Sequence, residues 1–166
     1  MFVIGQYVAC GNKGVCSVED ITTLDISGVD KSEKYYILKP VYNSASTIYI
    51  PVSAEGESLR PVLTAEEARA LIANISGVEL IDIPNEKQVE ALYKNCIRSN
   101  DIAQFAKLIK TIHGRRRMRT EAGRKETAID AKYSRIVSDF FFGELAISLD
   151  ITKKDVEAMI PDSNWD

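Results

Sequence analysis

The sequence predicts an α+β protein of two small domains, a β-barrel over residues 1–63 followed by an all-α domain of about five helices over residues 64–166. Short stretches of alternating polar and apolar residues fill the first part, whereas apolar residues recur at helical spacing in the second. The chain is 45% hydrophobic and 27% charged, which is typical of folded, water-soluble proteins. Each domain is small enough to be only marginally stable by itself.

The strands of the first domain are predicted from alternation and turn residues. Residues 6–10 and 15–21 alternate on either side of the turn 11–14, which predicts a hairpin. Further strands are expected at 34–40, which is rich in aromatic and branched residues, and at 47–51, which ends at a proline. Four or five short strands in about sixty residues suit a small closed barrel.

The helices of the second domain are predicted from their caps, which are Thr64, Asn85, Asp101 and Thr152. The first helix is expected to end at Gly77 in a left-handed conformation, and the third at Gly114. The fourth and longest is expected over residues 122–149. Trp165 lies in a polar terminal segment that we expect to be disordered.

Charge is distributed unevenly along the chain, although the formal net charge is only -3. Residues 87–135 hold 13 Lys/Arg and 5 Asp/Glu, a net charge of +8, whereas residues 1–86 and 136–166 carry -6 and -5. A basic segment between acidic ones predicts a polyanionic partner for the middle of the chain. The alternative is a solvated helix face that binds nothing.

The sequence carries no motif for catalysis, metal binding or membrane insertion. The three cysteines lack paired spacing, so we expect reduced thiols, no metal and no cofactor; Cys16 and Cys96 are expected to be buried. No nucleophile or carboxylate is spaced to orient His113, the single histidine, so we expect no enzyme. No stretch approaches the roughly 20 apolar residues that cross a bilayer. A cytoplasmic protein without a membrane partner is expected.

Residues in both domains resemble the CarD/CdnL family of transcription regulators, whose N-terminal module also resembles one in transcription-repair coupling factors. The first domain carries the similarity at Phe2, Ile4, Gly5, Val8, Gly14, Val15, Ile21 and the strands 35–38 and 47–51. In the second domain the similar segments are 99–101, 122–125 and 143–146, in the order of the family's helical domain. The resemblance covers nearly the whole chain.

This resemblance implies a Tudor-like or SH3-like barrel that pairs a strand edge with the RNA polymerase β subunit. It also implies a helical domain that touches promoter DNA near the upstream edge of the transcription bubble. The polymerase-binding candidates are Thr47, Ile48, Tyr49, Ile50 and Pro51 on the expected edge strand, together with Leu24. The alternative is an ordinary strand of the barrel wall on which Tyr49 is merely exposed.

Two features depart from the family pattern. Members commonly present basic residues on the polymerase-facing strands, where this chain has Tyr49 and Leu24. Many members also place a tryptophan wedge at the start of the second helix, where this chain has Asn85 and Glu86. DNA contact would then rest on phosphate-binding cations, for which the candidates are Arg115, Arg116, Arg117, Arg119, Arg124 and Lys125, with Lys87 and Lys94 as weaker ones.

The resemblance therefore implies a bacterial, nucleoid-associated and monomeric transcription regulator that binds the polymerase β subunit and, without sequence specificity, promoter DNA. It would change the stability of the open complex. The alternative function is a protein-only adaptor, whose basic helices bind an acidic protein surface.

Overall fold

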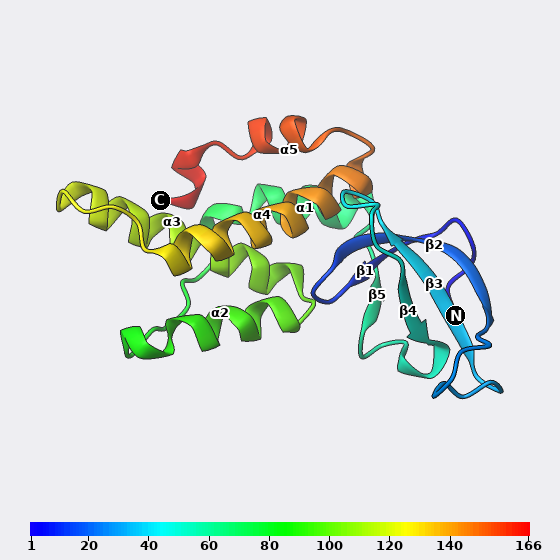
Figure 1. The fold of residues 1–166 in the computed structure, drawn as a ribbon. Helices are drawn as coiled ribbons and strands as arrows, with labels where there is room; N and C mark the ends of the chain where they lie inside the picture. Colours follow the sequence, from blue (N-terminus) through cyan, green and yellow to red (C-terminus); the bar gives the residue numbers. More distant parts are fainter. The chain divides into compact units, whose positions relative to one another are not determined.

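The computed structural model describes all 166 residues, which form two compact units, Met1–Val62 and Leu63–Asp166 (Figure 1). The first unit is a β domain and the second is a helical domain, so the α+β class is confirmed.

The β domain is one antiparallel sheet with the strand order β4-β3-β2-β1-β5. Its strands are β1 (Tyr7–Cys10), β2 (Gly14–Thr23), β3 (Lys34–Pro40), β4 (Ile48–Pro51) and β5 (Leu59–Pro61). The expected hairpin of β1 and β2 is present, with Cys10 opposite Gly14 at its turn. Gly14 has a φ of 74°, a conformation that glycine adopts without steric cost.

The expected closed barrel is wrong, because the sheet is open. β4 pairs only with β3, and β5 pairs only with β1. β4 ends at Pro51, and a 3-10 turn (Val52–Ala54), whose Val52 packs against the core, separates it from the three residues of β5. Two such short strands leave the edges of the sheet apart, although a bulge between Val18 and Asp20 bends β2.

The core of the β domain lies on one face of the sheet, with Phe2, Val8, Cys10, Cys16, Val18, Tyr36, Leu38 and Leu59 buried in it. The Tyr36 hydroxyl accepts from the Phe2 amide (3.0 Å) and donates to the Glu55 carboxylate (2.5 Å). Because both contacts are made, a buried tyrosine costs the core little. The Glu55 contact also fastens the connection between β4 and β5 to the core.

The helical domain contains five helices, as expected. They are α1 (Ala65–Ala73), α2 (Val89–Arg98), α3 (Ile102–Glu121), α4 (Ala128–Leu149) and α5 (Lys153–Met159). All four predicted caps accept a backbone N–H, and Thr64 and Thr152 form full capping boxes. Asn85 caps a 3-10 turn (Glu86–Gln88) that leads into α2. None of the helices combines the length and apolar composition that a membrane span requires.

Two helix ends differ from the expectation. α1 ends at Ala73, where the Asn74 side chain donates to the Ala70 carbonyl (2.8 Å), and Gly77 belongs to a 3-10 turn (Ile75–Gly77). α3 continues through Gly114 to Glu121. A glycine inside a helix costs only about 1 kcal/mol, which the contacts of the following turns outweigh.

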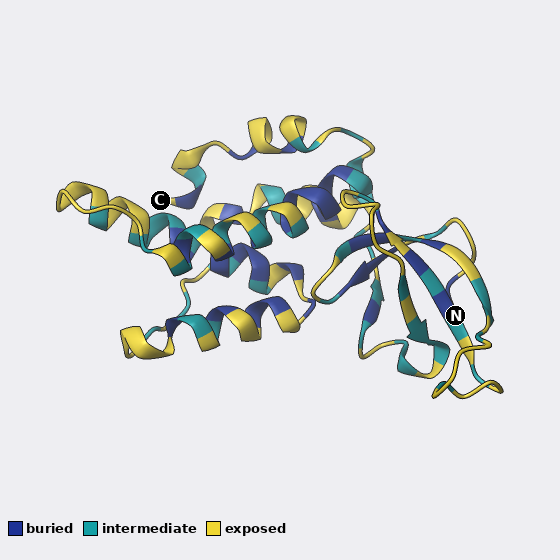
Figure 2. Cartoon of the chain, in the orientation of Figure 1, coloured by how far each residue is buried: buried dark blue, intermediate teal, exposed yellow.

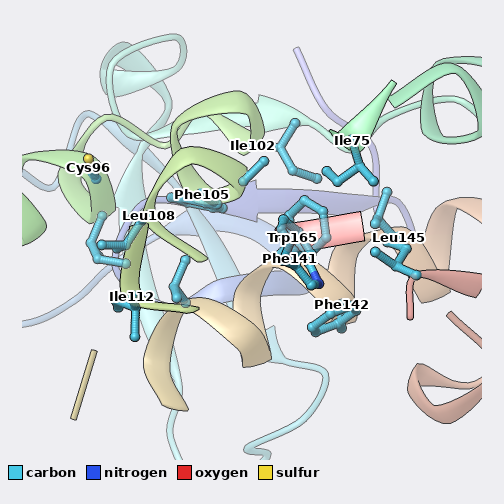
Figure 3. Close-up of a cluster of buried hydrophobic side chains, with 14 of the residues drawn as sticks. Ile75, Cys96, Ile102, Phe105, Leu108, Ile112, Phe141, Phe142, Leu145 and Trp165 are labelled. Atoms are coloured by element: carbon cyan, nitrogen blue, oxygen red, sulfur yellow. The ribbon is translucent and has the colours of Figure 1, made fainter. Parts of the chain in front are cut away.

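The core of the helical domain gathers around α3 and α4. Figure 3 shows the cluster running from Leu108 and Ile112 of α3, past Phe105 and Phe141, to Leu145 of α4. Cys96 is also buried, and Cys10, Cys16 and Cys96 are free thiols, as expected.

The terminal segment is ordered, contrary to the expectation of disorder. A final 3-10 turn (Asp162–Trp165) brings the Trp165 ring edge-on to Phe141, with 5.9 Å between ring centroids. Trp165 is only 5% exposed. Burial of so large an aromatic surface outweighs the polar composition of the segment.

Candidate functional site

The β domain offers an unpaired strand edge at β4. The strand pairs with β3 through Tyr49 opposite Ile37 and Ile50 opposite Tyr36, and nothing pairs with its other side. Ile48 and Ile50 pack against the core, whereas Tyr49 points outward and is 49% exposed. The strand thus combines free backbone groups with an exposed aromatic ring, the arrangement that accepts an added strand.

Of the other polymerase-binding candidates, only Leu24 is separated from this edge. Thr47 is exposed and lies just before β4, and Pro51 is its last residue. Leu24 follows β2, and β3 lies between β2 and β4, so Leu24 is not on the unpaired edge. Contact through Leu24 would require a partner that reaches across the sheet.

The helical domain presents most of the basic candidates on one hairpin, residues 115–127, which we call the basic hairpin. It comprises the last turns of α3, the turn at Gly123 (φ 72°) and the Thr127 cap of α4. It holds six Lys/Arg and two Asp/Glu, a net charge of +4. Figure 1 shows the end of α3 and this turn extending past the neighbouring helices, and Figure 2 shows that they are largely exposed.

Arg115 faces into the domain and is not free to bind a phosphate. Its Nε donates to both oxygens of Asp130 (3.2 Å each), and its terminal nitrogens donate to Glu86 (2.7 and 2.9 Å). Asp130 is fully buried and also accepts from the Tyr93 hydroxyl (2.7 Å). These four residues form a network that ties α3 to α2, α4 and the turn before α2.

The pKa values of Arg115 and Glu86 shift in the directions that keep this ion pair charged. Hydrogen bonds to Glu86 raise the pKa of Arg115. Burial lowers it, but the hydrogen bonds to Asp130 raise it further. The hydrogen bonds from Arg115 lower the pKa of Glu86. Burial, then the Asp130 contact, raises the pKa of the Tyr93 hydroxyl, so that the phenol stays protonated and donates.

Two further arginines fasten the basic hairpin. Arg116 donates through Nε to Glu126 (2.7 Å) and through Nη2 to the Ser134 hydroxyl (3.2 Å). Arg119 donates to the Lys125 carbonyl (2.7 Å) across the turn. Because a guanidinium has five N–H donors, both side chains keep unused donors while holding the turn in place.

Arg117 and His113 share a carboxylate that sequence spacing did not reveal. The Asp166 side chain contacts Arg117 Nη1 and lies 3.2 Å from His113 Nε2. We expected no carboxylate to orient His113, but the folding of the terminal segment onto α3 supplies one. His113 lies inside α3 rather than at a helix end.

The cations that remain without an ion pair or side-chain hydrogen bond are Arg124 and Lys125 in the basic hairpin and Lys87 before α2. Lys87 lies in the 3-10 turn before α2, next to Glu86. The ion pair between Glu86 and Arg115 joins this turn to the start of the basic hairpin. Lys94 lies 3.8 Å from Glu90 on α2. The structure therefore divides the basic candidates into anchored and free groups, a division that spacing along the sequence does not show.

The side chains at the wedge positions, Asn85 and Glu86, are both engaged in contacts within the domain. Asn85 accepts from the Lys87 amide as an N-cap, and Glu86 binds Arg115. Neither presents an apolar surface.

Glu144, from the segment that resembles the family's helical domain, is structural. It is 1% exposed, and its Oε1 accepts from the Leu63 amide (3.1 Å). This contact holds the chain where it enters α1.

The β domain is a small antiparallel sheet with an open edge strand, an arrangement to which a partner strand can add. Residues 2–63 match the CarD-like/TRCF RID domain family. The β domain is therefore a CarD-like RNA-polymerase-interacting domain, and the matched region ends where the helical domain begins. No match to a curated protein was found.

Proposed function

We propose that the chain is a CarD-like transcription regulator, which binds the RNA polymerase β subunit through β4 and promoter DNA through the basic hairpin, and which thereby changes the stability of the open complex. The match of residues 2–63 to an RNA-polymerase-interacting domain carries this proposal. The free edge of β4 and the projecting basic hairpin supply the two surfaces it requires.

The polymerase contact would form by strand addition to β4. Main-chain hydrogen bonds would give affinity, and Tyr49 would cover an apolar site on the partner strand. The expected polymerase-facing positions carry no cation in this chain, so the contact should depend little on salt.

A pull-down with the polymerase β lobe tests this contact. We expect Tyr49→Ala to lower retention at least about tenfold, as loss of a buried aromatic anchor does at many interfaces. Tyr7→Ala is the matched control, because Tyr7 is similarly exposed (43%) but starts the interior strand β1. Failure of the wild-type chain to be retained would refute the polymerase contact.

The DNA contact would rest first on the free cations Lys87, Arg124 and Lys125. Arg116, Arg117 and Arg119 can add phosphate contacts through their unused donors. Arg115 would position the hairpin through Asp130 and Glu86 instead of touching DNA. Such contacts fix position and supply affinity without reading sequence.

Duplex binding measured by fluorescence anisotropy over a salt series tests this assignment. Replacing Lys87, Arg124 and Lys125 by alanine should weaken binding and reduce the slope of log K against log salt by about 0.9 for each lost phosphate contact. The control removes the exposed cations Arg69, Arg98 and Lys154 of the same domain. Equal weakening by both triple variants would show that net charge, and not these three positions, accounts for DNA binding.

Affinity for free DNA should be weak, because acidic groups already occupy several arginines. Polymerase would hold the hairpin close to the promoter and raise its effective concentration. A competitor-challenge assay measures the lifetime of open complexes. We expect wild-type protein to change this lifetime, and the variant in which Lys87, Arg124 and Lys125 are replaced by alanine to change it less.

The same pairing of arginines with acids favours the second candidate, a protein-only adaptor. Arg115, Arg116 and Arg117 each contact a carboxylate of this chain, which shows that carboxylates fit these sites. A salt slope near zero with duplex DNA, together with retention of polymerase, would select the adaptor. Neither proposal assigns a catalytic step to the chain.

A further inference from the structure

One oxygen of the Asp166 carboxylate lies between two donors of α3. Asp166 Oδ1 contacts Arg117 Nη1 and is 3.2 Å from His113 Nε2. His113 and Arg117 are four residues apart on α3, so their side chains lie on the same face of the helix. A guanidinium and an imidazole that converge on one anionic oxygen form an anion site, and a carboxylate of the chain itself fills it.

The terminal 3-10 turn holds this carboxylate in position. Trp165, the residue before Asp166, is 5% exposed and packs edge-on against Phe141 of α4 (Figure 3). Because the backbone is anchored beside α3, the carboxylate loses little conformational freedom when it reaches the two donors. Asp166 is therefore a tethered ligand of the site, present at a high effective concentration.

The ion pair is exposed enough for its anion to be exchanged. The side chains of Arg117 and Asp166 are 50% and 49% exposed, and that of His113 is 23% exposed. Ion pairs this exposed favour the paired state by a factor of only about five or less. An outside anion that is held by further contacts can therefore displace the carboxylate while Trp165 stays docked.

The position of the site favours a DNA phosphate as that anion. Arg117 belongs to the basic hairpin, which has a net charge of +4 and carries the free cations Arg124 and Lys125. A duplex on the hairpin brings several phosphates at once, and a phosphate oxygen accepts from guanidinium and imidazole groups as a carboxylate does. A single inorganic phosphate would make only this one contact and would compete poorly with the tethered carboxylate.

We propose that His113 and Arg117 form a phosphate site of the DNA-binding surface, and that Asp166 is its intramolecular competitor, which a phosphate of duplex DNA displaces on binding. This inference rests on the proposed DNA binding. It adds to that proposal a contact outside the basic hairpin, His113, and an acidic residue that lowers the affinity for DNA.

Duplex binding by Asp166→Asn tests the competition, with the full chain and a fully paired, labelled duplex in a fluorescence anisotropy assay. An amide keeps the size of the side chain and its hydrogen-bonding groups but not its charge, so Trp165 should stay docked with unchanged emission. We expect the affinity to rise about threefold at low salt. The slope of log K against log salt should steepen by about 0.9, the value of one phosphate contact.

Two further variants separate the ion pair from a general effect of charge. Asp162→Asn is the matched control, because Asp162 lies in the same 3-10 turn but forms no ion pair, and it should raise the affinity clearly less. In an Arg117→Ala background, Asp166→Asn should lose most of its effect, because the cation for which carboxylate and phosphate compete is gone.

The imidazole of His113 reports on the site directly, because His113 is the only histidine. Saturating duplex should shift its proton resonances in the wild-type chain. In Asp166→Asn the same shift should require less duplex.

The outcomes distinguish this inference from the proposed function. If neither wild type nor Asp166→Asn binds the duplex, both fail. If wild type binds but the His113 resonances do not move, or if Asp162→Asn raises the affinity as much as Asp166→Asn does, the competition is overturned and phosphate binding by the hairpin stands.

Discussion

At the scale of single residues, Arg115 couples α3 to the other segments of the helical domain. Asp130 is fully buried and depends on Arg115 and Tyr93 for its hydrogen bonds. A buried carboxylate is tolerated only when it is paired, so the network is required for the fold whatever the domain binds.

Arg115→Ala should therefore destabilise the helical domain by about 3 kcal/mol, because it leaves Asp130 buried without its counter-ion. Urea unfolding followed by circular dichroism measures this change. Arg117→Ala is the matched control, since Arg117 is half exposed and its loss should change the unfolding free energy by less than about 0.5 kcal/mol. Equal effects of the two substitutions would contradict the network as described.

The acid dependence of stability follows from Glu86. Its pKa in the folded chain lies below the ordinary 4.5, chiefly because Arg115 donates hydrogen bonds to it. A group whose folded pKa is lowered stabilises the fold above its unfolded pKa, and the contribution is lost as the pH falls through the folded pKa.

Glu86→Gln should thus be less stable than wild type at neutral pH, and the difference should shrink as the pH falls below 4.5. Urea unfolding at neutral and acidic pH measures it. A difference that grows on acidification would have the wrong sign for this ion pair.

At the scale of elements, the terminal 3-10 turn completes the core between α3 and α4. Trp165 packs on Phe141, and Asp166 contacts His113 and Arg117 of α3. The segment thus lies beside the start of the basic hairpin and contributes to both the core and the electrostatics of that surface.

Trp165 is the only tryptophan, so its fluorescence reports this packing directly. Native emission should be blue-shifted and resist quenching by acrylamide, and unfolding in urea should shift it to the red, because the ring leaves an apolar environment. Emission that is already red-shifted and readily quenched in the native protein would show that the segment does not dock.

At the scale of the whole molecule, the chain contains two cores with separate sets of buried residues. The helical domain needs the residues just before α1, because Leu63 donates to the buried Glu144 and Thr64 caps the helix. A boundary placed after these residues would remove both contacts.

A fragment of residues 61–166 should therefore fold with helical circular dichroism and buried Trp165 emission. A fragment of residues 66–166 should be less stable by about 2 kcal/mol, the sum of a lost cap and a weakened buried hydrogen bond. Urea midpoints of the two fragments, compared with the full chain, measure the difference. Equal midpoints would mean that the entry contacts contribute nothing.

Local signals in the sequence predicted the elements well. Caps such as Thr64 and Asp101 accept hydrogen bonds from amides two or three residues away. They can therefore be predicted from the sequence without knowledge of the tertiary structure. The resemblance of residues 2–63 predicted the polymerase-interacting domain, which the family match confirms. The closed barrel failed because closure depends on whether distant edges meet, which strand alternation does not encode.

The sequence by itself determined the α+β class, the helix caps, the burial of Cys16 and Cys96 and the placing of the basic residues in one segment. Only the tertiary structure decided which of those cations are free, because the partners of Arg115 lie 29 and 15 residues away and Asp166 lies 49 residues from Arg117. Local signals reach across one helical turn, whereas ion pairs and core packing depend on segments that meet only when the chain folds.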